Sequence, residues 1–300
     1  MTLVLARAVF VASLLSLGGT LAFGVLVAAP ALARAPPVEG ARMRRMLRRL
    51  TWCSLSVAVA ALLTWTVLQA AEIAGTTGAP QALAALPPVL GSTSFGHLAL
   101  LQLALLGATA CLLRAGLLEG RAGLVAALGN VALQAGHGHA MAMDGGFSLL
   151  CAADVLHLLA AGAWIGGLLP LLLVVRFAPA ATGAMAARCF SPMGRVCVAA
   201  LAGSALVQGW VLVGGLPALF GRPYGWVVLV KTGLLLLLTG LALLNRYRLA
   251  PALRSAAAET GRHRLVSSIL VQTGLGLLAV VAASWLSGLT PGMDMGQPPS

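Results

Sequence analysis

The sequence predicts an all-α fold, a polytopic transmembrane bundle of about eight helices with both termini on the outer side of the membrane. Of its 300 residues, 60% are hydrophobic and only 9% are charged, and the mean hydropathy is +0.97. A water-soluble domain does not have this composition. Eight apolar runs are long enough to cross a hydrocarbon core of roughly 30 Å. The basic residues gather in the loops on one side.

The eight runs follow one another without a soluble domain, a low-complexity tract or a clear repeat between them. Residues 1–300 are therefore interpreted as a single transmembrane domain. The connection around Gly120 is short, which is typical of antiparallel helix neighbours. In chain order, the predicted spans are Ala8–Ala31, Thr51–Ala71, His97–Leu118, Ala122–Met141, Leu149–Val175, Gly194–Leu216, Gly225–Asn245 and Leu265–Leu286.

The first run has a competing interpretation as a signal peptide, because Ala31-Leu-Ala33 resembles a small-residue cleavage site. A signal peptide would place the arginines of residues 34–49 outside. This contradicts the bias of membrane proteins towards basic inner loops. The first run is therefore predicted to be a helix whose N-terminus faces outward.

This orientation puts sixteen of the 19 basic residues inside, and leaves only Arg7, Arg222 and Lys231 outside or within the membrane. The formal net charge of +12 is then a consequence of topology and of contact with anionic lipid in the bilayer, so nucleic acid is not a predicted partner. The inside set is Arg34, Arg42, Arg44, Arg45, Arg48, Arg49, Arg114, Arg121, Arg176, Arg188, Arg195, Arg246, Arg248, Arg254, Arg262 and Arg264.

A candidate metal-binding loop lies between the fourth and fifth runs. His137, His139, Met141 and Met143 stand at alternate positions, separated only by Gly or Ala, so the backbone can curl around a small ion. Imidazole and thioether ligands favour Cu(I), whereas Ca²⁺ and Mg²⁺ prefer oxygen cages and structural Zn²⁺ seldom uses Met. Cu(II) stays open. The alternative interpretation is a short surface loop that merely ends two helices.

Two further histidines belong to the same outer end. His97 begins the third run there, and His157 lies about two turns into the fifth. Four of the five histidines therefore converge on one end of the bundle, and His97 and His157 are predicted as additional ligands.

Three residues are candidates for a transport path or for support of the ligands. Asp154 precedes His157 by three positions, on the same helix face, where it can orient the imidazole or simply favour the helix start. Trp164 continues this stripe. Lys231, the only lysine, lies at a depth similar to that of Asp154; it can pair with Asp154 or extend to the interface.

On the inner side, four sulfur-bearing residues recur at intervals of four, which suits a metal exit site on one helical stripe. Ser191-Pro192, however, resembles a helix N-cap followed by proline, and this pattern predicts that the stripe is broken. The four residues are Met185, Cys189, Met193 and Cys197.

At these motifs the chain resembles the bacterial copper resistance protein D (CopD) family of inner-membrane proteins. The likeness covers about residues 90–290; residues 1–89 add two helices and a basic cytoplasmic loop that match in hydropathy alone. The matching motifs are Gly136-His137-Gly-His139-Ala, Asp154-Val-Leu-His157-Leu-Leu-Ala-Ala-Gly-Ala-Trp164-Ile-Gly-Gly-Leu-Leu-Pro170, Phe190-Ser191-Pro-Met-Gly194, Pro223-Tyr224-Gly225-Trp-Val-Val-Leu-Val-Lys231 and Leu244-Asn245-Arg246-Tyr-Arg248-Leu-Ala-Pro251.

The resemblance implies a multi-pass copper protein of the bacterial inner membrane that serves copper uptake or tolerance. In that membrane the outer side is the periplasm, so the orientation predicted from the charges makes both termini periplasmic. It also implies a periplasmic copper carrier of the CopC type as a partner. The residues that carry over are His137, His139, His157, Trp164 and Lys231. Met141 and Met143 extend the loop beyond the family pattern.

The first functional hypothesis is a copper transporter, not an enzyme, that imports Cu(I). An inside-negative potential favours this direction by about 2.3 kcal/mol per charge per 100 mV, and the chain has no phosphate-binding Gly-x-x-x-x-Gly-Lys motif for ATP-driven export. One alternative is an assembly or docking module for a periplasmic carrier that binds copper without transport. The other is a b-type haem oxidoreductase with His97 and His157 as axial ligands.

Overall fold

The computed structural model describes residues 1–33, 35–116, 121–138, 149–213, 216–253 and 258–287. Within these ranges every regular element is a helix and no strand occurs, so the predicted all-α class is confirmed. Residues His139, Met141 and Met143 of the predicted metal loop lie outside the described ranges.

Seven helical segments of the described residues are long and apolar enough to cross a membrane. Three of them combine shorter elements: α1 (Thr2–Phe23), η1 (Gly24–Ala28) and α2 (Ala29–Leu32); α9 (Leu149–Trp164) and α10 (Leu168–Phe177); and α13 (Pro223–Leu244), η4 (Asn245–Leu249) and α14 (Ala250–Ala252). The other four are α3 (Pro37–Ala74), α6 (Ser94–Arg114), α11 (Ala180–Leu212) and α15 (Ala258–Leu286).

The predicted span Ala122–Met141 corresponds to a shorter helix. Helix α7 (Arg121–Leu133) has 13 residues and passes into a single 3₁₀ turn, η3 (Gln134–His137). At 1.5 Å per residue α7 is about 20 Å long, less than the thickness of the hydrocarbon core. The predicted span was longer because the apolar sequence continues from α7 into the metal loop. The predicted number of eight spans is therefore not confirmed. The remaining short helices are α4 (Ala79–Ala84), α5 (Leu86–Ser92) and α12 (Leu216–Gly221).

Helix α11 corrects the prediction that a helix begins at Ser191-Pro192. It runs unbroken for 33 residues and contains Pro192 in its interior. Proline removes one backbone hydrogen bond and costs a helix interior about 3 kcal/mol. Phe190 and Cys197, on either side of it, are both buried in the core, and this burial compensates. The four sulfur side chains therefore share one continuous helix.

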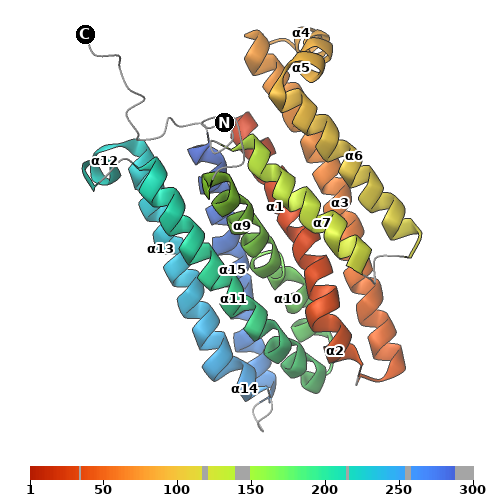
Figure 1. Ribbon diagram of the computed structural model, residues 1–300. Helices are drawn as coiled ribbons and strands as arrows, with labels where there is room; N and C mark the ends of the chain where they lie inside the picture. Colours follow the sequence, from red (N-terminus) through yellow and green to blue (C-terminus); the bar gives the residue numbers. More distant parts are fainter. Residues whose placement is uncertain (34, 117–120, 139–148, 214–215, 254–257, 288–300) are drawn as a thin grey trace.

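Helix α1 is the centre of the bundle (Figure 1). It packs against α3, α7, α9 and α15. Glycine permits its closest crossing: a Cβ on Gly19 would collide with the backbone of Gly166, and a Cβ on Gly166 would collide with the Leu15 carbonyl. Gly166 lies in the break between α9 and α10, so this contact fixes the start of α10 and the depth of α9.

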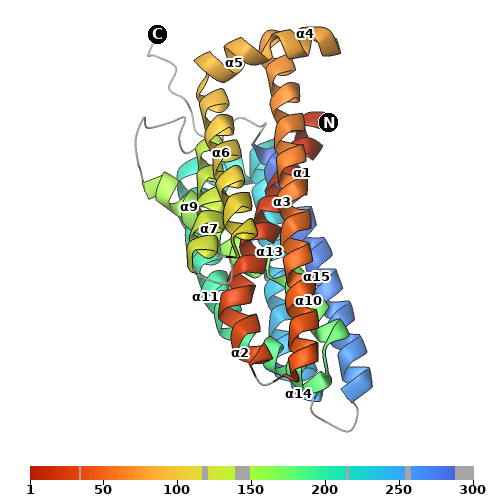
Figure 2. The same ribbon diagram turned by 90° about the vertical axis from the view of Figure 1, so that its right-hand side faces the viewer.

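The two ends of the bundle differ in charge. Figures 1 and 2 place the N-terminus, α4 and α5 towards one end, where Figure 1 also shows α12, and both place α2, α14 and the start of α3 towards the other. The arginines of residues 42–49 lie in the first turns of α3, and Arg246 and Arg248 lie in η4. The end of the bundle at the N-terminus of α1 is the outer end, and the end that carries these arginines is the inner end.

Candidate metal centre

A cavity of about 250 Å³ opens in the bundle between α1, α9, α11, α13 and α15. On α13 its wall extends from Tyr224 at the outer end to Leu238, fourteen residues further in, which is about 20 Å along the helix. Most of the wall is apolar. Its polar members are Arg7, Gln134, Asp154, His157, Gln208, Tyr224, Lys231, Thr232, Ser284 and Ser287.

His157 is held on this wall by a hydrogen bond from α9 to α11. Its Nδ1 lies 3.0 Å from Ser204 Oγ, and the Ser204 hydroxyl donates to the Leu201 carbonyl at 3.1 Å. A hydroxyl has a single hydrogen, so when Ser204 donates that hydrogen to Leu201, Nδ1 of His157 is the donor to Ser204. In the neutral imidazole Nε2 then carries the lone pair, and it has no hydrogen-bond partner among the described residues. This is the tautomer that a metal ligand needs.

Asp154 lies one turn before His157 and faces the start of the predicted metal loop. A Cβ built on Gly138 would lie 2.9 Å from Asp154 Oδ2. Glycine at 138 therefore lets the backbone approach the carboxylate closely. The loop that contains His139, Met141 and Met143 begins directly at this contact.

Lys231 and Arg7 are the two bases that interact electrostatically with Asp154. Neither forms a direct ion pair with the carboxylate in the part of the chain that the structure describes. Lys231 lines the cavity, so its ammonium group does not need to reach the lipid interface. The predicted pairing of Lys231 with Asp154 is thus an interaction of charges around one cavity rather than a direct contact.

His137 lies in a second, aromatic environment beside the cavity. Its ring is 5.0 Å from the Trp65 ring and 5.4 Å from the Phe95 ring, centroid to centroid. Both ring nitrogens are buried and have no hydrogen-bond partner among the described residues. Burial, and secondly the charge of Arg7, lower the pKa of His137 to about 4. The imidazole is therefore neutral near pH 7 and offers an unshared lone pair.

Arg7 joins the aromatic environment to the cavity. Its Nη2 donates to the His137 carbonyl at 3.2 Å, its guanidinium lies 5.4 Å from the Trp65 ring centroid, and its side chain lines the cavity. Sequence reasoning used Arg7 for topology alone and missed this role. A lone arginine directly before the first apolar run, whose other neighbours are apolar, was the signal that could have found it. Ser204 gave no such signal, because its role depends on a contact between helices.

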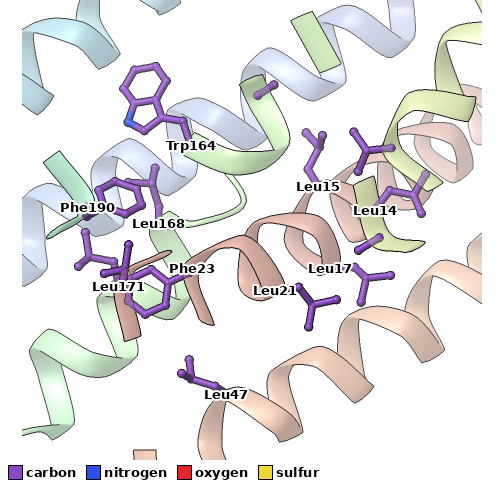
Figure 3. Close-up of a cluster of buried hydrophobic side chains, with 14 of the residues drawn as sticks. Leu14, Leu15, Leu17, Leu21, Phe23, Leu47, Trp164, Leu168, Leu171 and Phe190 are labelled. Atoms are coloured by element: carbon purple, nitrogen blue, oxygen red, sulfur yellow. The ribbon is translucent and has the colours of Figure 1, made fainter. Parts of the chain in front are cut away.

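Two predicted site residues lie away from the cavity wall. His97 is exposed on α6, and its Nε2 is 3.1 Å from the Gly91 carbonyl oxygen. Trp164 is 2% exposed and packs in the apolar core near Leu168 and Phe190 (Figure 3). The structure therefore brings together Asp154, His157 and Lys231, and sets the loop start beside them. Among the described residues, no three His, Cys, Asp or Glu side chains form a metal-binding group.

Two family models match the chain. The first is described as "Copper resistance protein D-like, N-terminal domain" and matches residues 1–149. The second is described as "Copper resistance protein D" and matches residues 184–286. His137 lies in the first match and Lys231 in the second, whereas Asp154 and His157 fall between them.

Curated relatives agree with these matches. Copper resistance protein D of Pseudomonas syringae pv. tomato is 32% identical over 192 residues, which cover 58% of this chain and 60% of that protein. Inner membrane protein YebZ of Escherichia coli (strain K12) is 28% identical over 163 residues, 53% of this chain and 56% of that protein. The matched part thus spans less than two thirds of either relative. No solved structure matches the chain.

Proposed function

The chain belongs to the copper resistance protein D family, and from this membership we propose that it binds Cu(I) at the outer end of its bundle and imports it into the bacterial cell. It is a multi-pass protein of the inner membrane, as its seven apolar segments and the relative named inner membrane protein YebZ indicate. The proposal concerns the ion, its route and its direction.

The observation that carries the proposal is the state of His157 on the cavity wall. With the Ser204 hydroxyl donated to Leu201, the imidazole proton lies on Nδ1 and the Nε2 lone pair is available to a soft cation. The cavity that His157 lines reaches well below the outer end of the bundle. An ion bound there has already left the outer surface.

The loop residues His139, Met141 and Met143, with His137 at the start of the loop, are the proposed ligands that first bind copper at the outer surface. The contact between Gly138 and Asp154 supports this order, because it fixes the first residue of the loop against the cavity wall. A periplasmic carrier of the CopC type is the proposed donor of copper to the loop.

The charges around the cavity favour the monovalent ion. When Lys231 and Arg7 are protonated and Asp154 is ionised, these three groups carry a net charge of +1, which repels a cation in the cavity. By Coulomb's law this repulsion is twice as large for Cu(II) as for Cu(I) at the same position. Such a site suits transit more than storage, because an ion that binds weakly also leaves easily.

A route from the cavity to the inner end is offered by the sulfur side chains of α11. Leu201 on the cavity wall is one turn from Cys197, and Met193, Cys189 and Met185 follow at further intervals of one turn. Thiol and thioether groups are soft ligands for Cu(I). The unbroken helix across Pro192 supports them as a series of exit ligands.

The alternative functions differ in what supports them. A b-type haem held by His97 and His157 gains no support, because His97 is exposed on α6 and His157 lines the cavity. A docking module that binds copper without moving it shares the outer ligands with the transporter. Flux distinguishes the two, so the purified protein should be reconstituted in liposomes that contain a Cu(I)-specific dye.

If the protein transports copper, the dye inside the liposomes should respond to external Cu(I), and an inside-negative potential should accelerate that response. Protein-free liposomes and liposomes with the His157→Ala variant serve as controls. Copper that binds to the reconstituted protein without reaching the dye would reject transport in favour of docking.

A further inference from the structure

A second cavity, of about 390 Å³, lies towards the inner end of the bundle between the α1–α2 segment and α3. It is separate from the cavity that His157 lines, with which it shares no lining residue among those described. Its wall is formed by Thr20, Leu21, Gly24, Val25, Ala28, Ala29, Leu32, Ala33, Arg44, Leu47, Arg48, Thr51, Leu113 and Gly116.

This inner cavity combines an apolar wall with two positive charges. Arg44 and Arg48 are one turn apart, on one face of α3. Among the described residues, no acidic side chain lines the cavity, and neither guanidinium has an ion-pair partner. Two unpaired guanidinium groups close together suit an anion, and phosphate is the group that arginine binds best through paired hydrogen bonds.

The surroundings leave room for an elongated apolar molecule. In both views (Figures 1 and 2) the end of α6 and the start of α7 stop short of α2 and of the start of α3, so these two helices do not cover the inner end of α3. Leu113, in the last turn of α6, and Gly116, just beyond it, also line the cavity. Gly24 also lines the cavity, and a Cβ on it would meet nothing within 4 Å.

We propose that the inner cavity binds one anionic phospholipid, whose phosphate contacts Arg44 and Arg48 and whose acyl chain lies along the apolar wall. The apolar lining explains the chain, and charge complementarity explains the headgroup. On the predicted orientation this end of the bundle lies in the cytoplasmic leaflet, where basic pockets between membrane helices attract anionic lipid headgroups. The site is independent of copper.

The test measures retained lipid by native mass spectrometry of the detergent-purified full chain, titrated with dioleoylphosphatidylglycerol or dioleoylphosphatidylcholine. The wild type is expected to bind one molecule of the phosphatidylglycerol at least about tenfold more tightly than phosphatidylcholine. The double variant Arg44→Gln/Arg48→Gln should lose this preference. Equal affinity of the wild type for both lipids would overturn the proposal.

The matched control is Arg45→Gln/Arg49→Gln, because it removes the same two charges, at the same spacing, from neighbouring positions that do not line the cavity. It should keep the preference; equal loss in both double variants would show a diffuse charge effect and reject a built site. Gly24→Leu, which fills the open space without changing charge, should also weaken binding. Competition by glycerol 3-phosphate as effective as that by phosphatidylglycerol would reject the acyl-chain contact.

Discussion

Nδ1 of His157 lies 3.0 Å from the hydroxyl oxygen of Ser204, and this contact links α9 to α11 at the wall of the cavity that His157 lines. When the hydroxyl donates to Leu201, Ser204 accepts from Nδ1 and leaves Nε2 as the imidazole nitrogen that can bind a metal. The copper site therefore depends on a small side chain from a second helix. Ser204→Ala tests that dependence.

Ser204→Ala removes the acceptor of the His157 Nδ1 proton and should lower copper uptake by about tenfold, the usual effect of losing such a supporting hydrogen bond. Ser204→Thr keeps the hydroxyl and should retain most of the uptake. Folding should survive in both, since a lost neutral hydrogen bond costs about 1 kcal/mol. Uptake equal to that of the wild type in Ser204→Ala would show that the tautomer does not matter.

Gly138→Ala should reduce copper uptake because the added methyl group would lie 2.9 Å from Asp154 Oδ2 and must displace either the carboxylate or the loop start. The control is Gly203→Ala, since a Cβ at Gly203 meets nothing within 4 Å. The two variants should insert into membranes equally well. An identical uptake rate in both variants would show that the position of the loop start at Gly138 does not affect copper delivery.

Lys231→Met should be more harmful than the double change Lys231→Met/Asp154→Asn. The single variant leaves the Asp154 carboxylate with only Arg7 as a nearby base, whereas the double variant removes the unbalanced charge. Thermal unfolding midpoints of the detergent-purified proteins measure this coupling in a double-mutant cycle. Simple additivity of the two single effects would mean that the charges do not interact across the cavity.

Met193→Leu/Cys197→Ser should slow copper release inside the liposome and leave copper binding at the outer end unchanged. Both substitutions keep the approximate volume and remove soft ligands from the stripe on α11. Cys53→Ser/Cys111→Ser is the control, because both of these cysteines are exposed on other helices. Unchanged flux in the stripe variant would remove α11 from the exit route.

The sequence predicted the spans well wherever hydropathy decides them. It also identified, as candidate site residues, polar and ionisable side chains whose burial in a membrane is costly. Asp154, His157 and Lys231 were chosen for residue type and depth, and they line one cavity. Pattern could not predict that Pro192 lies inside a helix, because burial of Phe190 and Cys197 outweighs the local helix-start signal. Arg7 and Ser204 act through contacts between distant segments, which hydropathy and spacing do not contain.

The central claim is that copper passes the imidazole of His157, and the most direct test compares His157→Ala with His97→Ala in cellular copper uptake and in Cu(I) affinity of the purified protein. The account predicts that His157→Ala loses most of the uptake and binds Cu(I) more weakly, whereas His97→Ala, which alters an exposed histidine on α6, stays close to the wild type. Equal uptake in the wild type and His157→Ala would contradict the account, and an equal loss in both variants would return His97 to the ligand set.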